Sequence, residues 1–345
     1  MRIVCTIGDC NGVGLEVWVK ALAEAQRHSK VFGTRWALIA HPRSVAEYVD
    51  GCCLSVKLQQ GSLQIGRLTV ELIPCQTYAP VRWGYPDPLA ARQAWEALAT
   101  ALELARSGQA DAIVTLPITK HLMNEIGWRF PGQTEYLAHP YPNRTPTMLF
   151  VAGSLRVALL TTHVPLRRVH SMVTPEAFSA FVQRLHDGLS VDFGLREPKI
   201  ALLGLNPHAG ESSRLGNEER MLQPAIEKLR RAGYVVDGPF AADSFFARQR
   251  WKEYDVTVAM YHDQGLIPFK LLARGRGVNV TLGLPFVRTS PDHGTAYDIA
   301  GKGIADHRSM YHALLLSLEL AQRRRAHGLH PRRRDIAPVR EASLA

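Results

Sequence analysis

The sequence predicts an α/β fold with a mainly parallel sheet, and three observations support this prediction. Short runs rich in β-branched residues alternate with longer amphipathic stretches along most of the chain. Hydrophobic residues make up 46% and charged residues 21% of the 345 residues, close to the average of globular proteins. The chain is longer than one hydrophobic core usually organises, so one large domain or two lobes are expected.

Each element of this fold is predicted by local periodicity. Strands are expected where short apolar runs lie between turn residues, at 2–7, 36–40, 56–58, 68–73, 111–116, 155–161, 199–205 and 255–260. Helices are expected where apolar residues recur at helical spacing, at 15–27, 89–106, 175–189, 218–232 and 307–324. The segment 275–303 is rich in glycine and is predicted to be mostly turns.

Several protein classes are excluded by what the chain contains. No apolar run approaches the roughly 20 residues of a membrane-spanning helix. The N-terminal MRIVCTIGDCNG is expected to be a strand and a loop rather than a signal peptide. The cysteines number five and form no Cys-x-x-Cys pair, so neither a disulfide framework nor a zinc finger is expected. These features favour a reducing cytoplasm.

The net charge of +10 raises the alternative of a nucleic-acid-binding protein. Residues 322–345 contain seven arginines against one aspartate and one glutamate, which is half of that net charge. We expect residues 326–345 to be a flexible, solvated basic tail, and residues 1–325 to be one catalytic unit. The body of the chain then suits a small anionic substrate, with no nucleic acid or membrane as partner. The alternative predicts salt-dependent binding that is lost when residues 322–345 are removed.

Four common catalytic signatures are missing from the sequence. There is no G-x-G-x-x-G after the first strand, no P-loop, no G-x-S-x-G and no H-E-x-x-H. A Rossmann dehydrogenase, a P-loop kinase and an α/β hydrolase are therefore disfavoured.

One pattern occurs three times: an apolar run ends, a histidine follows, and a turn begins. VALLTTHVP contains His163, IALLGLNPHAGE contains His208, and VTVAMYHDQG contains His262. Ligands of open α/β sheets bind at the carboxyl ends of the strands, where these histidines fall. Three imidazoles suit zinc or a similar divalent ion and leave one position open for a substrate oxygen. A single histidine after a strand more often caps a turn or packs locally, and it is the repetition of the pattern that favours a shared site.

Two further groups of residues could bind an anion. Lys270, Asn279 and Arg288 follow His262, and a lysine and an arginine near a metal would hold a phosphate or carboxylate. The glycines of 292–306 let backbone approach a ligand closely. A surface lysine, a structural arginine and a simple connecting loop are the alternatives. The glycine-bearing loop 8–16 could likewise bind an anion or only allow tight helix–strand packing.

With these residues assembled, residues 3 to about 315 resemble the 4-hydroxythreonine-4-phosphate dehydrogenase family of vitamin B6 biosynthesis. The motifs that carry the resemblance are TIGDCNGVGLE, TLPITK, FPGQTEYLA, TTHVPLRRV, GLNPHAGE, GPFAADSFF, AMYHDQGLIPFK and VNVTLGLPFVRTSPDHGTAYDIAGKG. The resemblance implies an isocitrate/isopropylmalate dehydrogenase-like fold, with two interleaved α/β lobes around a central cleft that holds the active site.

The resemblance also implies a role for particular residues. The metal ligands would be His163, His208 and His262, shared across a homodimer so that each site needs both subunits. Catalytic roles would fall to Lys270 and Asp243. The substrate would contact Gln133, Thr134, Lys270, Asn279 and Arg288. NAD would lie along His293, Gly294, Thr295, Ala296, Asp298, Ile299, Gly301 and Gly303.

The implied reaction oxidises 4-phosphooxy-L-threonine to a 3-keto acid that loses carbon dioxide to give 3-amino-2-oxopropyl phosphate. A divalent ion would stabilise the developing alkoxide; zinc is favoured, with magnesium, manganese, cobalt and nickel as alternatives. Gln133 stands where the family usually has histidine and cannot become cationic. The same chemistry on threonate or erythronate phosphate, or on a cis-dihydrodiol dicarboxylate, therefore stays open, as does a metal-binding relative without activity.

Overall fold

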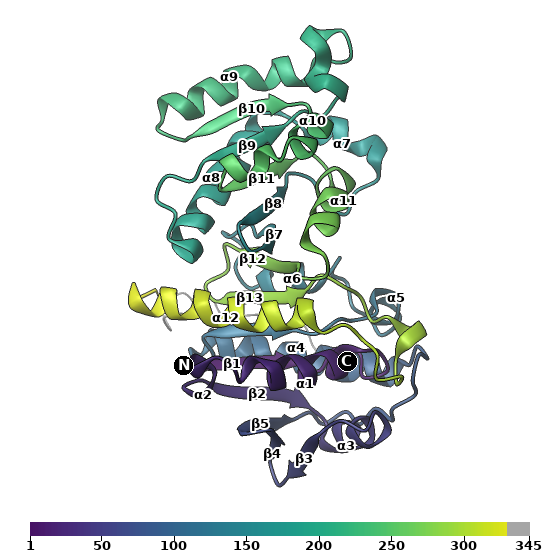
Figure 1. Ribbon diagram of the computed structural model, residues 1–345. Helices are drawn as coiled ribbons and strands as arrows, with labels where there is room; N and C mark the ends of the chain where they lie inside the picture. Colours follow the sequence, from purple (N-terminus) through teal and green to yellow (C-terminus); the bar gives the residue numbers. More distant parts are fainter. Residues whose placement is uncertain (330–345) are drawn as a thin grey trace. The chain divides into compact units, whose positions relative to one another are not determined.

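The computed structural model describes residues 1–329, and these form two compact units. The first unit is discontinuous: it contains Met1–Pro146 and the chain from Leu284 onward, while the second contains Thr147–Gly283. Both units consist of a sheet flanked by helices (Figure 1). The predicted α/β fold class is confirmed. The predicted tail extends beyond the described residues from His330 onward.

The sheet of the first unit has a parallel core. Its strands, in spatial order, are β13 (Val287–Pro291), β6 (Ala112–Thr115), β1 (Arg2–Thr6), β2 (Arg35–Ala40), β5 (Leu68–Pro74), β4 (Ser62–Ile65) and β3 (Val56–Gln59). The pairs from β13 to β5 are parallel, and β4 and β3 add an antiparallel edge. Every residue of β6 is buried, as expected for a strand inside a sheet covered on both faces.

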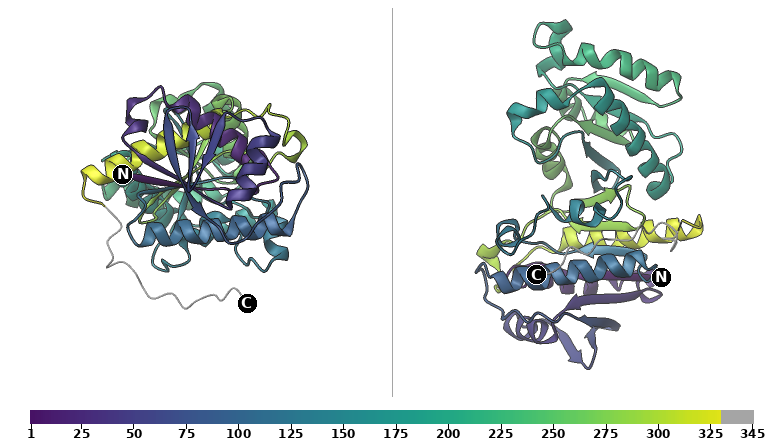
Figure 2. Two further views of the ribbon diagram at one scale, coloured as in Figure 1. Left: turned by 90° about the horizontal axis from the view of Figure 1, so that it is seen from below. Right: turned by 180° about the vertical axis from the view of Figure 1, so that it is seen from behind.

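Helices cover both faces of this sheet. They are α1 (Gly14–Ala25), α2 (Ser29–Phe32), α3 (Pro42–Gly51), α4 (Pro88–Arg106), α5 (Lys120–Glu125), α6 (Gln133–Ala138), the short η4 (Tyr297–Ile299) and α12 (Arg308–Ala326). Helices α1 and α12 lie together on one face and α4 lies on the other (Figure 2). The start of α4 is fixed by Pro88 and by Asp87, whose side chain accepts a hydrogen bond from the Leu89 N–H.

Six strands belong to the second unit. Its strands, in spatial order, are β10 (Val236–Phe240), β9 (Ile200–Leu203), β11 (Val256–Ala259), β8 (Leu155–Leu159), β7 (Thr147–Ala152) and β12 (Val278–Leu282). The pairs from β10 to β8 are parallel, whereas β7 pairs antiparallel with both β8 and β12. Its helices are α7 (Leu166–Met172), α8 (Pro175–Gly188), η1 (Leu189–Phe193), η2 (Pro207–Ser213), α9 (Glu218–Arg231), α10 (Ala242–Ala247), η3 (Arg250–Glu253) and α11 (His262–Ala273).

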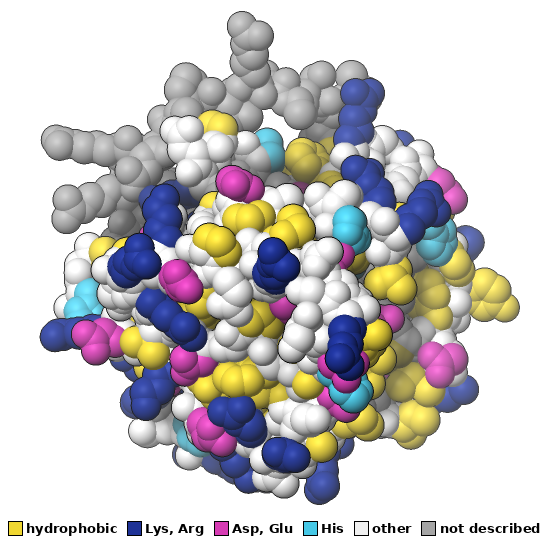
Figure 3. All heavy atoms as spheres, turned by 90° about the horizontal axis from the view of Figure 1, so that it is seen from above, with side chains coloured by type: hydrophobic (Ala, Val, Ile, Leu, Met, Phe, Trp, Pro, Cys, Tyr) yellow, Lys and Arg dark blue, Asp and Glu magenta, His cyan; other side chains and the backbone are white. Residues whose placement is uncertain are grey.

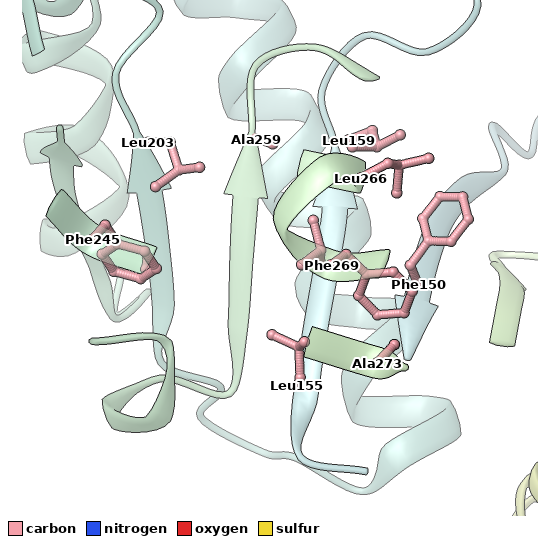
Figure 4. Close-up of a cluster of buried hydrophobic side chains, with 11 residues drawn as sticks. Phe150, Leu155, Leu159, Leu203, Phe245, Ala259, Leu266, Phe269 and Ala273 are labelled. Atoms are coloured by element: carbon pink, nitrogen blue, oxygen red, sulfur yellow. The ribbon is translucent and has the colours of Figure 1, made fainter. Parts of the chain in front are cut away.

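A hydrophobic cluster joins α11 to the middle strands of the second unit. Figure 4 shows Leu159, Leu203 and Ala259 on the three parallel strands, with Leu266 of α11 beside Leu159 and Phe269 of α11 beside Phe150. Phe269 is fully buried, and its ring centroid lies 5.7 Å from that of Phe150. Burial of these side chains fixes α11 on the sheet and so fixes the residues at its first turn.

Two sequence predictions are wrong in detail. A turn is expected after His262, yet α11 begins there. Gly265 and Pro268 hide this helix from local pattern analysis, although a side chain at Gly265 would lie 2.8 Å from Leu159, so the glycine allows α11 to approach β8. The segment 275–303, predicted to be turns, contains β12 and β13. These strands depend on pairing with distant strands rather than on local signals.

The arginines that open the predicted basic region are ordered parts of α12. Arg324 is 6% exposed and donates a hydrogen bond to the Leu284 carbonyl at 3.0 Å. Arg325 pairs with Asp111 at 3.1 Å. Lys and Arg side chains on the face drawn in Figure 3 are interspersed with Asp and Glu rather than gathered in one patch.

Candidate functional site

The three histidine turns follow three adjacent parallel strands of the second unit. His163 follows β8, His208 follows β9 and His262 follows β11, and β11 lies between the other two. Parallel strands have their carboxyl ends at the same edge of a sheet, so the three turns share one edge. The sheet order therefore gives the repeated sequence pattern a common location.

His163 and His262 lie side by side. Their ring centroids are 5.7 Å apart with an interplanar angle of 45°. The Nδ1 atom of His262 is 2.7 Å from Oδ1 of Asp263. A carboxylate partner on one ring nitrogen fixes the tautomer and directs the other nitrogen to a ligand, which is the usual arrangement at metal-binding histidines.

His208 lies on an unusual turn. His208, Ala209 and the four residues that follow in η2 all have positive φ. Only glycine adopts that conformation without cost, so the surrounding contacts must maintain the turn. Within residues 1–329 of one chain, no three or more His, Cys, Asp or Glu side chains lie close enough together to hold a metal ion.

Two buried carboxylates hold the base of the His208 turn. Glu219 accepts hydrogen bonds from the Asn206 backbone N–H at 2.7 Å and from its side-chain Nδ2 at 3.1 Å. Glu218 accepts from the same Nδ2 at 2.7 Å and also pairs with His170 of α7. The turn is thereby tied to α9 and, through His170, to the helix that follows His163.

The remaining candidate residues of the second unit lie on three elements. Lys270 is exposed on α11, which also carries His262. Asn279 lies on β12 opposite Phe150, and its Oδ1 atom is buried without a hydrogen-bond partner among the described residues. Asp243 is exposed in the first turn of α10, with Ser244 Oγ 3.4 Å from its Oδ1.

Three candidate substrate residues meet in the first unit. Arg288 of β13 is 3% exposed, and it donates to Thr134 Oγ1 at 3.4 Å and to Thr115 Oγ1 at 2.7 Å. Burial lowers the pKa of its guanidinium to about 10, so the group stays cationic at neutral pH. Gln133 donates from Nε2 to the Leu116 carbonyl at 3.2 Å, and its Oε1 is buried with no partner within residues 1–329.

The loop expected to bind the cofactor packs against the N-terminal loop. The Thr295 carbonyl accepts a hydrogen bond from the Val13 N–H at 2.9 Å, and a side chain at Gly12 would lie 2.6 Å from that carbonyl oxygen. Tight packing therefore accounts for the glycine at position 12. His293 contacts the Gly294 carbonyl through Nδ1, while its Nε2 is buried and has no partner in the described part of the chain.

The same loop is joined to a buried carboxylate. Tyr297 donates a hydrogen bond to Asp9, and Thr119 Oγ1 lies 2.8 Å from Asp9 Oδ2 and 2.7 Å from the Tyr297 hydroxyl. Burial raises the pKa of the Asp9 carboxyl, while hydrogen bonds from Tyr297, Asn11 and Thr119 act in the opposite direction. Burial and the hydrogen bond to Asp9 raise the pKa of the Tyr297 phenol.

Sequence reasoning missed several residues of these networks. Thr115 and Thr119 lie in TLPITK, a motif that contributes to the family resemblance but suggests no contact by itself. Asp9 and Tyr297 lie within TIGDCNGVGLE and TAYDIAGKG, where glycines are the more obvious feature. Their pairing is a long-range contact, and no local spacing signals it.

The donors present fit a divalent metal and a dinucleotide. Paired imidazoles, one of them oriented by Asp263, are suitable ligands for zinc or a similar ion. Gln133, Asn279 and His293 each keep a buried polar atom without a partner in residues 1–329, and such atoms need a hydrogen-bond partner when a ligand is bound. The metal ligands, substrate residues and cofactor residues expected from the sequence remain predictions.

Comparison with known proteins places this chain among close relatives. It is 41% identical to 4-hydroxythreonine-4-phosphate dehydrogenase of Paracoccus denitrificans, over 93% of this chain and 98% of the relative. The crystal structure of 4-hydroxythreonine-4-phosphate dehydrogenase from Klebsiella pneumoniae matches with a TM-score of 0.77 and 33% identity, covering 93% and 99% of the two chains. A terephthalate 1,2-cis-dihydrodiol dehydrogenase from Burkholderia xenovorans matches with a TM-score of 0.60 and 28% identity, covering 92% and 98%.

The family assignment depends on a match over most of the chain. Residues 29–317 match the model of the family described as pyridoxal phosphate biosynthetic protein PdxA. This range includes the three histidine turns and the loop that follows β13. The chain described here belongs to the PdxA family of pyridoxal phosphate biosynthetic proteins.

Proposed function

We propose that this protein is an oxidoreductase that converts 4-hydroxythreonine 4-phosphate, also called 4-phosphooxy-L-threonine, in the biosynthesis of pyridoxal 5'-phosphate. The reaction is an NAD-dependent oxidation to a 3-keto acid, which decarboxylates to 3-amino-2-oxopropyl phosphate. The single observation that carries the proposal is the pair His163 and His262 at the carboxyl edge of three parallel strands, in a chain of this family.

The metal site is proposed to comprise His163, His208 and His262. A divalent ion held by these histidines, zinc in the first instance, would supply Lewis acidity at the substrate oxygen, and NAD would supply the hydride-accepting group. His163 and His262 are adjacent, but residues 1–329 of one chain bring no three possible ligands close enough to hold a metal ion, so we propose a homodimer in which both subunits contribute histidines to each site. Because Asp263 contacts Nδ1 of His262, Nε2 is the nitrogen of this ring that is proposed to bind the metal.

The substrate is proposed to be held by donors of the two units. Arg288 supplies a buried cation for the phosphate or carboxylate, oriented by Thr115 and Thr134. Lys270 and Asn279, which belong to the second unit, are proposed to contact the substrate as well. Oxidation of an alcohol releases a proton, and Lys270 and Asp243 are the proposed proton-transfer residues.

NAD is proposed to bind along His293, Gly294, Thr295, Ala296, Asp298, Ile299, Gly301 and Gly303. NAD is favoured over NADP because residues 293–303 contain no arginine for a 2'-phosphate. A cytoplasmic location is proposed because all five cysteines are free thiols. Among the described helices, none has both the length and the apolar character that crossing a membrane requires.

The test is the appearance of NADH absorbance when metal-loaded protein is mixed with NAD and 4-phosphooxy-L-threonine. Activity that a chelator abolishes, and that His262→Ala lacks, supports the proposal. Absence of NADH in folded, metal-loaded, dimeric protein contradicts this substrate. Threonate phosphate, erythronate phosphate and a cis-dihydrodiol dicarboxylate form the comparison panel, the last because a dihydrodiol dehydrogenase is among the structural relatives.

A further inference from the structure

The turns that carry the three histidines are connected to each other by side chains outside the histidine set. Thr161 donates to the Met260 carbonyl from its backbone N–H at 3.2 Å and from its hydroxyl at 2.7 Å. Thr161 is 3% exposed, so this contact is shielded from water. It fixes the turn after β8, which bears His163, to the turn after β11, which bears His262.

Gln264 makes the second connection. Its Oε1 accepts a hydrogen bond from the Met260 N–H at 2.7 Å, and its Nε2 donates to the Gly204 carbonyl at 2.6 Å. Gly204 is the first residue after β9 and opens the turn that bears His208. The Gln264 amide thus links two backbone segments, the turn that precedes His262 and the turn that precedes His208.

The orientation of the Gln264 amide follows from the hydrogen-bonding character of its two backbone partners. The Gly204 carbonyl can only accept and the Met260 N–H can only donate, so Nε2 must face Gly204 and Oε1 must face Met260. Together, Thr161 and Gln264 connect all three turns through Met260. The backbone around Gly204 is also closely packed, since a side chain there would lie 2.8 Å from Cα of Ala209, next to His208.

We propose that Gln264 is a positioning residue that holds the His208 and His262 turns in place at the edge of the sheet, and thereby sets the affinity with which their histidines bind a metal ion. This inference rests on the proposed function, because it assumes that the histidines bind the metal. Gln264 itself contacts backbone rather than the ion. Groups that orient metal ligands typically change metal affinity by about tenfold to a hundredfold when they are replaced.

A purely structural role for Gln264 is the competing explanation. Gln264 lies in the first turn of α11, where a glutamine or glutamate side chain often accepts a hydrogen bond from backbone at the helix start. The two roles use different atoms of the amide. The helix-start role needs only Oε1, whereas the connection to the His208 turn needs Nε2.

Gln264→Glu separates the two roles. Glutamate can still accept from the Met260 N–H, but it cannot donate to the Gly204 carbonyl, and its second oxygen would face that carbonyl. Gln264→Met removes both hydrogen bonds without adding charge. Gln183→Glu is the matched control, because Gln183 is exposed on α8 of the same unit.

The measurement is the affinity of the full chain for zinc, by competition with a chromophoric chelator, together with the visible absorption of the cobalt(II) form. Circular dichroism and thermal unfolding establish that each variant is folded. We expect Gln264→Glu and Gln264→Met to bind zinc about tenfold to a hundredfold more weakly, with an altered cobalt spectrum. Gln183→Glu should behave like the wild type.

Two outcomes overturn the inference, and they are distinguishable. If Gln264→Glu and Gln264→Met retain wild-type zinc affinity and cobalt spectrum, Gln264 only supports α11, and the proposed metal site is unaffected. If the wild type binds zinc no more tightly than His163→Ala and His262→Ala, the metal site itself is wrong and the role of Gln264 fails with it.

Discussion

The phenol of Tyr297 donates a hydrogen bond to the carboxylate of Asp9, although 288 residues separate them along the chain. Thr119 bonds to both groups, so three segments of the first unit meet at one buried carboxylate. Tyr297 lies within the segment proposed to bind NAD. The contact therefore anchors that segment to the loop that follows β1.

Tyr297→Phe should weaken NAD binding. The variant keeps the ring but loses the hydrogen bonds to Asp9 and Thr119, each worth about 1 kcal/mol, so the KM for NAD should rise about fivefold to thirtyfold. The KM for the phosphorylated substrate should change little. Steady-state kinetics with each substrate varied in turn measures both constants. Tyr85→Phe is the control, since Tyr85 is 70% exposed, and an unchanged KM for NAD in Tyr297→Phe contradicts the prediction.

Asp9 should make stability depend on pH. Because burial raises the pKa of Asp9 in the folded state, the folded protein binds this proton more tightly than the unfolded chain does. The protonated Asp9 carboxyl therefore contributes fully to stability below pH 3.8, its pKa in the unfolded chain. This contribution is lost as the pH rises through the higher pKa of the folded state. Relative to the wild type, Asp9→Asn should therefore gain free energy of unfolding between about pH 4 and about pH 7.

Urea unfolding of the wild type and Asp9→Asn at both pH values measures this difference. Asp50→Asn, at an exposed position, is the matched control. The prediction is contradicted if the difference in free energy of unfolding between Asp9→Asn and the wild type stays constant with pH or falls as the pH rises. Either result would show that folding does not raise the pKa of Asp9.

Arg288→Lys should impair substrate binding despite conserving the charge. A lysine ammonium cannot reproduce the separate contacts of the guanidinium with Thr115 and Thr134. Hydrogen bonds to charged groups contribute about 1.5–3 kcal/mol, so the KM for the phosphorylated substrate should rise about tenfold to a hundredfold. Arg35→Lys, at an exposed position of the same unit, should have wild-type kinetics. A wild-type KM for Arg288→Lys would remove Arg288 from the substrate site.

Gln133→His should make the KM for the phosphorylated substrate depend on pH through the new histidine, a dependence that the glutamine of the wild type cannot produce. The glutamine offers an acceptor, Oε1, because its Nε2 is already bonded to the Leu116 carbonyl. A histidine becomes cationic below its ordinary pKa of about 6.5 and then attracts an anionic group. The KM for the phosphorylated substrate should fall a few-fold near about pH 6 relative to about pH 8. Equal KM ratios for Gln133→His, wild type and the control Gln183→His at the two pH values would contradict this prediction.

Most of the regular structure was predictable because it depends on short-range periodicity. The helix expected at 89–106 is observed as Pro88–Arg106, and the strand expected at 255–260 as Val256–Ala259. The strands β4, β7 and β10 and the helices α3, α5, α6, α7 and α10 were missed, and α11 was obscured by Gly265 and Pro268. Strand pairing and close helix–strand contact stabilise these elements, and neither leaves a repeat in the local sequence.

The candidate site was predictable only in part, for a related reason. The repeated histidine pattern and the ordered motifs are contiguous in the chain, so the α/β class and the family could be inferred from sequence alone. The motifs also contain Thr115, Asp9 and Gln264, but a motif does not state which group a side chain contacts. Those partners lie on other elements and become visible only when the strands are ordered in space.

The sequence by itself determined the α/β class, the family and the position of each histidine after an apolar strand, since all of these follow from neighbouring residues. Only the tertiary structure decided that β11 lies between β8 and β9, that His163 and His262 lie side by side, and that Tyr297 contacts Asp9. The physical reason is that strand order and side-chain packing are set by long-range burial and hydrogen bonding, which are satisfied over the whole unit rather than within a local segment.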